Sequence, residues 1–384
     1  MPPIPSLSLT RLTLTDFRSY AGLRLDVAAS LVALTGLNGA GKTNLLEAIS
    51  LLAPGRGLRG ASFDELARQG GAGSWAIAAD IVKDGDHIAL GTGWSGQGES
   101  PEASRLVVID GHVEKGSGAL GQHMRLLWLT PAMDRLFAGP ASDRRRFLDR
   151  MVQAFDPEHG SRVGVFEKVM RERNLLLEDS RADRAWLSSL EAHMAEAAVA
   201  IAAARLHAVA ALQAHIDQGR RDSPFPWGAV AVEGEIETLL GAMPAVRAED
   251  EYRKILHDSR RLDAAAGRTL NGPHRSDLSV HHGPKDMPAA LSSTGEQKAL
   301  LIGLILAQAR AVKAESNMAP VLLLDEIAAH LDRERREALF TALTALGCQA
   351  WMTGTDAETF GGMGEKGAVF HVEAGTVTEV ADRQ

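Results

Sequence analysis

The sequence predicts an α/β protein that contains a mixed sheet and a mainly helical insertion. Two short apolar runs, residues 31–35 and 321–324, have the length and composition of strands that are buried on both faces. A glycine-rich loop follows the first run and leads into residues 42–52, where leucine and isoleucine recur at helical spacing. Residues 161–217 contain no proline and many alanines, which favours two or three helices.

The order of the predicted elements divides the chain into two domains. Alternating or short apolar runs predict strands within residues 7–14, 23–27, 31–35, 73–113, 321–324, 348–356 and 367–380. Helical spacing predicts helices over residues 42–52, 141–155, 161–217 and 247–265, while 227–240 is ambiguous between strand and helix. We therefore expect residues 1–150 and 266–384 to form one α/β domain with an antiparallel β patch. Residues 151–265 would form the inserted arm.

Composition is that of a soluble globular protein. The chain has 384 residues, of which 45% are apolar and 23% charged. We find no uninterrupted apolar run near the roughly 18 residues of a membrane span, and no secretory signal at the start. Cys348 is the only cysteine, which excludes an intramolecular disulfide and suits a reducing cytoplasm. The net charge of −8 argues against a protein that coats nucleic acid everywhere, but it leaves room for a local basic face.

Residues 36–43, GLNGAGKT, match the phosphate-binding loop G-x-x-x-x-G-K-[ST] at every fixed position. The loop lies between a predicted strand and a predicted helix, which argues against a glycine-rich turn that matches by chance. Lys42 is expected to reach the terminal phosphates of ATP, and Thr43 to bind Mg²⁺. The residues expected to contact the nucleotide are Gly36, Leu37, Asn38, Gly39, Ala40, Gly41, Lys42, Thr43 and Asn44.

A second motif, VLLLDE at residues 321–326, places two acidic residues at the end of a buried strand. Ligands of open α/β sheets bind at the carboxyl ends of the strands. We expect Asp325 to complete the Mg²⁺ site and Glu326 to orient and deprotonate the attacking water, so that Glu326 and Lys42 are the catalytic candidates. The alternative is an acidic pair that only ends the strand.

A polar turn before the helix that follows residue 294 carries a third motif, Ser293-Thr294-Gly295-Glu296-Gln297, which matches S-x-G-x-Q. The three motifs in this order resemble the ATP-binding-cassette (ABC) ATPases. The resemblance implies an ABC-type head in which Ser293, Gly295 and Gln297 cap the γ-phosphate of ATP bound by a second subunit. Two chains would then pair head to tail. Residues 329–332, AHLD, resemble the loop that crosses this interface.

Four further stretches, residues 14–20, 126–151, 169–179 and 269–278, resemble the RecF family of bacterial recombination and gap-repair proteins. The resemblance implies a weak, DNA-stimulated ATPase of recombinational repair and replication-fork maintenance. It implies an ATP-dependent homodimer that binds single- and double-stranded DNA near gaps or junctions. RecR and RecO are the partners that it implies, and loading of the recombinase is the outcome.

The chain departs from the wider ABC pattern at two positions. No glutamine occupies the Mg²⁺-sensing loop, for which residues 130–134 are the nearest candidate, and WMTGTD at 351–356 has no switch histidine. Thr353 or Thr355 can serve as the polar sensor instead, and both departures suit slow hydrolysis. By analogy with related heads, Arg18 is expected to contact a phosphate or the adenine side, with an exposed arginine on a turn as the alternative.

Clusters of arginine are the candidates for DNA contact. Arg144, Arg145 and Arg146 follow one another and cannot share one helix face, while Arg275 belongs to a second basic cluster. Arginine contacts to phosphate would give salt-sensitive, sequence-independent binding. The alternative is a solvated face with internal ion pairs. Gly272-Pro273 is expected to present His274 and Arg275 outward.

Three other functions compete with that of a DNA-binding ATPase. A transporter subunit normally lacks a helical arm of this length, and the head of a chromosome-structuring SMC protein needs far more coiled coil than residues 161–217. An SMC-like or other ABC-type head, or a clamp that binds ATP without hydrolysing it, stays open.

Overall fold

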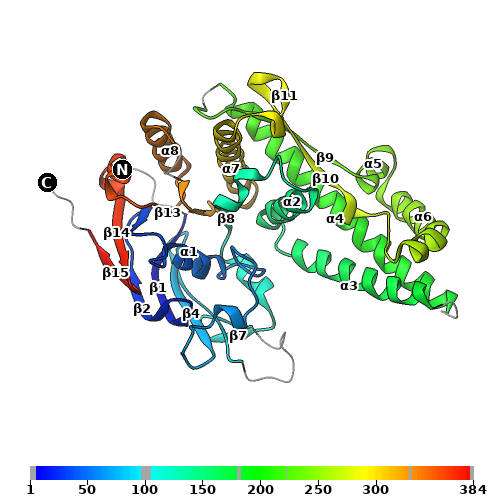
Figure 1. Cartoon of the computed structure of the whole chain (residues 1–384), viewed down its shortest axis with the longest axis horizontal. Coiled ribbons are helices and arrows are strands. Elements are labelled where there is room, and N and C mark those ends of the chain that lie inside the picture. The colour runs from blue at the N-terminus through cyan, green and yellow to red at the C-terminus, as the bar shows by residue number, and fades with distance from the viewer. Residues whose placement is uncertain (1–5, 97–104, 180–182, 222, 328–330, 381–384) are drawn as a thin grey trace. The chain divides into compact units, whose positions relative to one another are not determined.

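The computed structural model describes residues 6–96, 105–179, 183–221, 223–327 and 331–380 (Figure 1). The chain forms two compact units. The first unit consists of Met1–Asp134, Asp222–Phe225 and Leu301–Gln384, and the second of Arg135–Arg221 and Pro226–Leu300. Most of the expected arm lies in the second unit, which also takes in α2 and residues 266–300. The domain bounds drawn from the sequence stay a prediction.

The first unit holds the strands β1 (Leu7–Phe17), β2 (Tyr20–Asp26), β3 (Leu31–Thr35), β4 (Trp75–Lys83), β5 (Asp86–Trp94), β6 (Leu106–Ile109), β7 (His112–Glu114), β8 (Leu126–Leu129), β12 (Val321–Leu324), β13 (Ala350–Thr353), β14 (Gly367–Glu373) and β15 (Thr376–Glu379). Its helices are α1 (Lys42–Ser50) and α8 (Arg333–Leu346), and α7 (Thr294–Ser316) begins in the second unit and ends in the first. The second unit holds α2 (Ala141–Phe155), α3 (His159–Glu178), α4 (Arg184–Gly219), α5 (Glu235–Ala242), α6 (Ala245–Ala266), β9 (Gly228–Glu233), β10 (Asp277–His282) and β11 (Met287–Pro288).

The central sheet of the first unit has the order β15-β14-β3-β13-β12-β8. All neighbours from β14 to β8 run parallel, and only β15 is antiparallel. Every residue of β3, β12 and β13 is buried, which explains why these strands read as uninterrupted apolar runs. Because parallel strands end at one edge, the segments that follow β3, β12 and β13 come together there.

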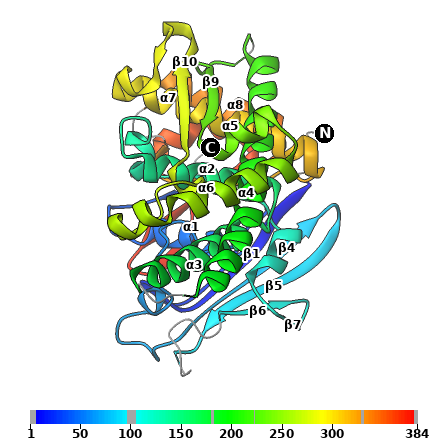
Figure 2. The same ribbon diagram turned by 90° about the vertical axis from the view of Figure 1, so that its right-hand side faces the viewer.

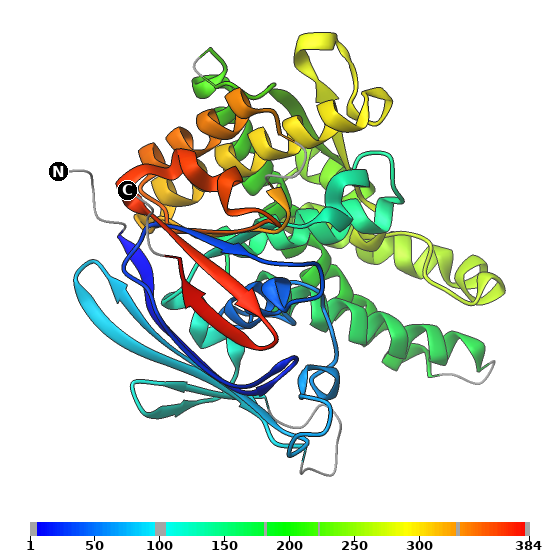
Figure 3. The same cartoon turned by 60° about the vertical axis from the view of Figure 1, so that its left-hand side comes forward.

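A second sheet of the first unit is antiparallel, with the order β2-β1-β4-β5-β6-β7. Figure 3 shows its blue N-terminal strands near the red C-terminal hairpin of β14 and β15. The mixed sheet with a phosphate-loop helix and an antiparallel β patch confirms the predicted fold class. Neither β8 nor α8 was predicted from the sequence.

Figure 2 shows the helices α3, α4, α5 and α6 of the second unit. They pack around a core that includes the buried side chains of Phe166, Met194, Tyr252 and Leu256. The unit also contains a three-stranded antiparallel sheet, β11-β10-β9, which the sequence analysis did not predict as a sheet. The ambiguous stretch 227–240 contains both a strand, β9, and a helix, α5.

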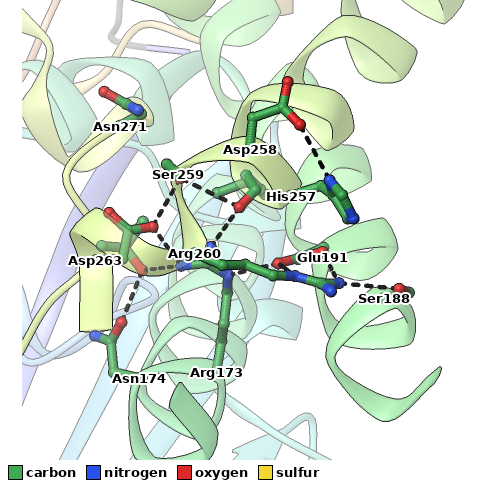
Figure 4. A network of polar contacts seen from close by, with 12 residues as sticks. Arg173, Asn174, Ser188, Glu191, His257, Asp258, Ser259, Arg260, Asp263 and Asn271 are labelled. Atoms are coloured by element: carbon green, nitrogen blue, oxygen red, sulfur yellow. Dashed lines mark hydrogen bonds and ion pairs between the residues drawn. The ribbon is translucent and has the colours of Figure 1, made fainter. Parts of the chain in front are cut away.

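The helices of the second unit share a buried network of ion pairs, drawn in Figure 4. Arg173 of α3 is fully buried and donates to Glu191 of α4 at 3.1 Å and to Asp263 of α6 at 2.8 Å. Its guanidinium also donates to Thr269 Oγ1 at 3.0 Å and to the carbonyl of Leu256 at 2.7 Å. A buried charge is tolerated only when its donors are satisfied, and here one arginine joins three helices.

Among the described residues, α4 is the one helix whose length and composition suit a membrane span. Its most apolar window of 18 residues has a mean hydropathy of 1.5, although no uninterrupted apolar run reaches that length. Half of that window is buried inside the protein, in the core shared with α3 and α6. The core helix of a soluble protein can have the same length and hydropathy, so these two properties of α4 are weak evidence for a membrane span.

Candidate nucleotide-binding site

The glycine-rich loop joins β3 to α1 and depends on glycine at two tightly packed positions. Gly36 has φ 141° and a side chain there would collide with the carbonyl oxygen of Val372 in β14. Gly41 has φ 112°, and a Cβ there would lie 2.8 Å from the hydroxyl of Tyr20. That hydroxyl donates to the Gly41 carbonyl at 3.1 Å, and burial raises the pKa of Tyr20. The β1–β2 turn therefore packs directly against the loop, which the sequence analysis did not foresee.

Lys42 spans the loop from the first turn of α1. Its ammonium donates to the carbonyls of Gly36 at 2.6 Å and Leu37 at 2.9 Å. Burial lowers the pKa of Lys42, against the charges of Glu326 and Asp325, which raise it. Leu37, Asn38 and Gly39 are exposed at the tip of the loop.

Thr43, Asp325 and Thr353 meet at the edge where β12 and β13 end. The hydroxyls of Thr43 and Thr353 donate to Asp325 Oδ1 at 3.0 and 2.7 Å. The parallel register, which pairs Leu324 with Met352, brings the residues after β12 beside the end of β13. A threonine hydroxyl and one carboxylate are oxygen ligands that suit Mg²⁺, which usually keeps waters and phosphate oxygens as its other ligands. The residues therefore fit the expected metal.

Glu326 follows Asp325 in an unusual backbone conformation, with φ 51°. Its N–H donates to Thr353 Oγ1 at 2.8 Å, so one hydroxyl contacts both acidic residues. Positive φ at a residue other than glycine is uncommon and concentrates at functional sites. The Glu326 side chain is half-buried. The other polar candidate, Thr355, is exposed and bonds to Asp356.

The segment after β8 occupies the same edge. β8 pairs with β12 in parallel, and the N–H of Asp325 donates to the carbonyl of Leu129 at 2.8 Å. Thr130, which follows Leu129, is buried. Residues 130–134, expected as the nearest equivalent of the Mg²⁺-sensing loop, thus begin beside Asp325.

Arg18 is held on the flank of α1. Its Nε and Nη2 donate to the two oxygens of Glu47, each at 2.9 Å, and Nη1 donates to the carbonyl of Glu65 at 2.8 Å. Glu47 is fully buried and also accepts from Arg59, a residue that the sequence analysis missed. Asn44 accepts from Arg59 and donates to Ser19. These bonds brace α1 from outside, and nucleotide contact by Arg18 and Asn44 stays a prediction.

The S-x-G-x-Q turn belongs to the second unit. Ser293, Thr294 and Gly295 are exposed, as a surface for a second subunit would require. Glu296 accepts from the Ser293 N–H at 3.0 Å and pairs with Lys285 at 2.5 Å; the hydrogen bond from Lys285 is the main cause that lowers its pKa to about 2. Gln297 is buried and donates to the Ser292 carbonyl at 2.8 Å, so it shapes the turn from within. Of the expected interface loop, Ala329 and His330 lie outside the described residues.

The arginine candidates for DNA contact differ in their surroundings. Arg144 donates to both oxygens of Asp277, at 2.8 and 2.6 Å. This pairing counts against DNA contact by Arg144. DNA contact by any of these arginines stays a prediction. Arg146 is 78% exposed and pairs with Asp143, while Arg145 is half-buried and Arg275 exposed. His274 is not presented outward as expected, because its Nε2 bonds to the Thr269 carbonyl and its ring lies 5.8 Å from that of Phe166.

Known proteins resemble this chain over nearly its whole length. A family model described as an AAA domain matches residues 11–69. The DNA replication and repair protein RecF of Mesorhizobium japonicum is 51% identical over 375 residues, which cover 97% of this chain and 98% of that protein. RecF of Brucella suis is 52% identical over 376 residues, 97% of each chain.

Solved structures show the same fold. The recombination mediator protein RecF-ATPrS in the RecFOR pathway has a TM-score of 0.86 at 22% identity, over 99% of this chain and 100% of that one. An SMC head bound to the C-winged helix domain of ScpA has a TM-score of 0.54 at 14% identity, over 98% of this chain and 97% of that one. At these identities the solved structures establish only the fold, that of an ABC-type head. The relatives with about 50% identity show the family: the chain belongs to the RecF family of DNA replication and repair proteins.

Proposed function

We propose that this protein is an ATP-dependent DNA-binding protein of recombinational repair and replication-fork maintenance. ATP with Mg²⁺ would bind at the loop after β3, and two chains would close head to tail on DNA near a gap or junction. Slow, DNA-stimulated hydrolysis to ADP and phosphate would reopen the dimer. RecR and RecO are the proposed partners, and loading of the recombinase is the proposed outcome. The proposed location is the cytoplasm. Family membership supports the pathway, and relatives with this fold are described as complexes with ATP.

The observation that carries the proposal is the meeting of Thr43, Asp325 and Thr353 beside the phosphate loop. Bound Mg²⁺ would supply positive charge to the phosphates. Thr43 and Asp325 would hold it, and Lys42 would exchange the carbonyls of Gly36 and Leu37 for phosphate oxygens. Glu326 would orient and deprotonate the attacking water. Phosphoryl transfer needs positioned charges of this kind more than covalent chemistry.

The exposed Ser293-Thr294-Gly295 turn supports the proposed dimer. It begins α7, a helix of 23 residues, and a helix start offers free N–H groups and a positive dipole end to an anion. The turn would seal the γ-phosphate held by the partner's loop, so each nucleotide would be shared between two chains.

Sedimentation with and without ATP and junction DNA tests the proposal on wild-type, Lys42→Met and Ser293→Arg chains. Wild type should dimerise only with ATP, and Lys42→Met should stay monomeric because it binds nucleotide poorly. Ser293→Arg should bind ATP yet stay monomeric, because its side chain blocks the seal. ATP-driven dimers of Ser293→Arg with wild-type affinity would refute the head-to-tail arrangement.

A further inference from the structure

The second unit contains a hollow of about 410 Å³ that the nucleotide site does not use. Side chains from α2, α3, α4 and the turn η4 (Pro273–Arg275) line it. Its wall carries three arginines, Arg145, Arg146 and Arg205, together with the carboxylates of Asp149 and Glu167. Whether the hollow attracts an anion depends on which of these charges are already matched.

Asp149 is fully engaged within the protein. Its two oxygens accept from Arg205 at 2.8 and 2.9 Å, and Oδ1 also lies 2.8 Å from Nε2 of the buried His159. Arg205 is almost fully buried and donates in addition to the carbonyl of Pro273 at 2.7 Å. Arg205 also lies 3.7 Å from the buried carboxylate of Glu237, so its charge is matched within the protein. Glu167 is 53% exposed and lies 3.9 Å from Arg171.

Arg145 has no such partner. Among the described residues its one hydrogen bond runs from Nη1 to the carbonyl of Ser276 at 3.1 Å, and it forms no ion pair. The nearby carboxylate of Asp277 is held by both arms of Arg144. Burial lowers the pKa of Arg145; the charges of Asp277 and Asp149 act against this shift, and those of Arg205 and Arg275 add to it. A partly desolvated guanidinium whose one hydrogen bond goes to a neutral carbonyl is stabilised by an anion that enters the hollow.

We propose that this hollow is an anion site for a phosphate group, with Arg145 as the central ligand and Arg146 at the rim. Arg146 is 78% exposed and its pair with Asp143 is a surface pair of small worth, so it is able to turn toward a ligand. The guanidinium fork matches two phosphate oxygens. The phosphate belongs either to a DNA backbone, which rests on the proposed function, or to free inorganic phosphate.

Two variants with matched controls test the site. Ser142 is an exposed residue on the lining, so Ser142→Glu adds a carboxylate to the hollow without removing any ion pair. The control is Ser161→Glu, the same change at an exposed position of α3 outside the lining. Arg145→Ala removes the ligand, and Arg247→Ala removes an exposed arginine of α6 off the lining. Retained ATP binding and circular dichroism show that each chain is folded.

Fluorescence anisotropy with labelled junction DNA over a salt series measures the first arm. Arg145→Ala and Ser142→Glu should lower the affinity about tenfold, and Arg145→Ala should reduce the slope of log K against log salt by about 0.9, the value of one phosphate contact. Thermal unfolding with millimolar inorganic phosphate measures the second arm. Phosphate should stabilise wild type and Arg247→Ala, but neither Arg145→Ala nor Ser142→Glu.

The arms separate the possible outcomes. A loss in the phosphate arm with unchanged DNA affinity supports the anion site and rejects DNA as its source. Variants that equal their controls in both arms overturn the proposal. Wild type that binds no DNA contradicts the proposed function, and the phosphate arm alone then decides for or against the site.

Discussion

At the scale of single residues, Thr353 connects the two acidic residues of the candidate site. Its fully buried hydroxyl donates to Asp325 and accepts from the N–H of Glu326, which holds Glu326 at positive φ. Because it contacts both the proposed metal ligand and the backbone of the proposed base, we expect Thr353 to act as a positioning residue. Thr353 is therefore the residue that we propose as the polar sensor, at the sheet edge where ABC ATPases usually have a histidine.

Replacing Thr353 by valine should slow hydrolysis and spare ATP binding. The change keeps the volume but removes one hydrogen bond to a charged group, worth about 1.5–3 kcal/mol, so the single-turnover rate should fall about 10–100-fold. Thr353→Ser should restore the rate because it restores the hydroxyl. The exposed Thr355→Val is the matched control. Equal rates for Thr353→Val and Thr355→Val would rule out a positioning role.

Glu326→Gln distinguishes a hydrolysing dimer from a clamp that only binds ATP. Loss of a general base lowers rates about 10²–10⁴-fold, so phosphate release should fall by this factor while the ATP-bound dimer lives longer. Phosphate release and dimer dissociation are measured on the same samples. If wild type already releases phosphate no faster than Glu326→Gln, and both dimers have the same lifetime, the non-hydrolysing clamp is the better description.

At the scale of elements, the sequence predicted best where a local pattern has a single physical reading. The run 31–35 and the loop after it were predicted at their observed positions, because a buried strand, glycines and a helix start each leave a local signature. The pairs that brace the site, Arg18 with Glu47 and Tyr20 with Gly41, depend on tertiary packing and leave no such signature. The short strand β8 was missed for the same reason, since its pairing with β12 defines it.

The buried Arg173 network shows how strongly the second unit depends on one long-range contact. Arg173→Met should destabilise this unit by about 3–5 kcal/mol, because the buried Asp263 would lose its counter-charge, while Glu191 would keep only Arg260. Arg171→Met is the control: Arg171 is 66% exposed on the same helix, and its loss should cost about 0–1 kcal/mol. Urea unfolding followed by circular dichroism compares the two. A cost for Arg173→Met as small as that for Arg171→Met would show that the network adds little stability.

At the scale of the whole molecule, function is divided between two compact units that hold different parts of the proposed machinery. The phosphate loop, Asp325 and Thr353 belong to the first unit, and the Ser293-Gly295 turn to the second. With a net charge of −8, the chain as a whole repels nucleic acid, so DNA binding requires local basic sites. The head-to-tail proposal predicts that ATP stabilises both units of a dimer but only the first unit of a monomer.

Calorimetry of wild-type and Ser293→Arg chains tests this division. At about 100 times its Kd, ATP should stabilise the first unit of Ser293→Arg by about 2.7 kcal/mol, a rise in Tm of roughly 5–10 °C, and leave the second transition in place. In wild type both transitions should rise, by an amount that grows with protein concentration, because the turn of one chain seals the nucleotide of the other. Lys42→Met, or removal of Mg²⁺ with a chelator, should abolish both effects. A second transition that moves equally in Ser293→Arg and wild type would mean that the turn responds to nucleotide bound in its own chain, and the shared-nucleotide dimer would have to be abandoned.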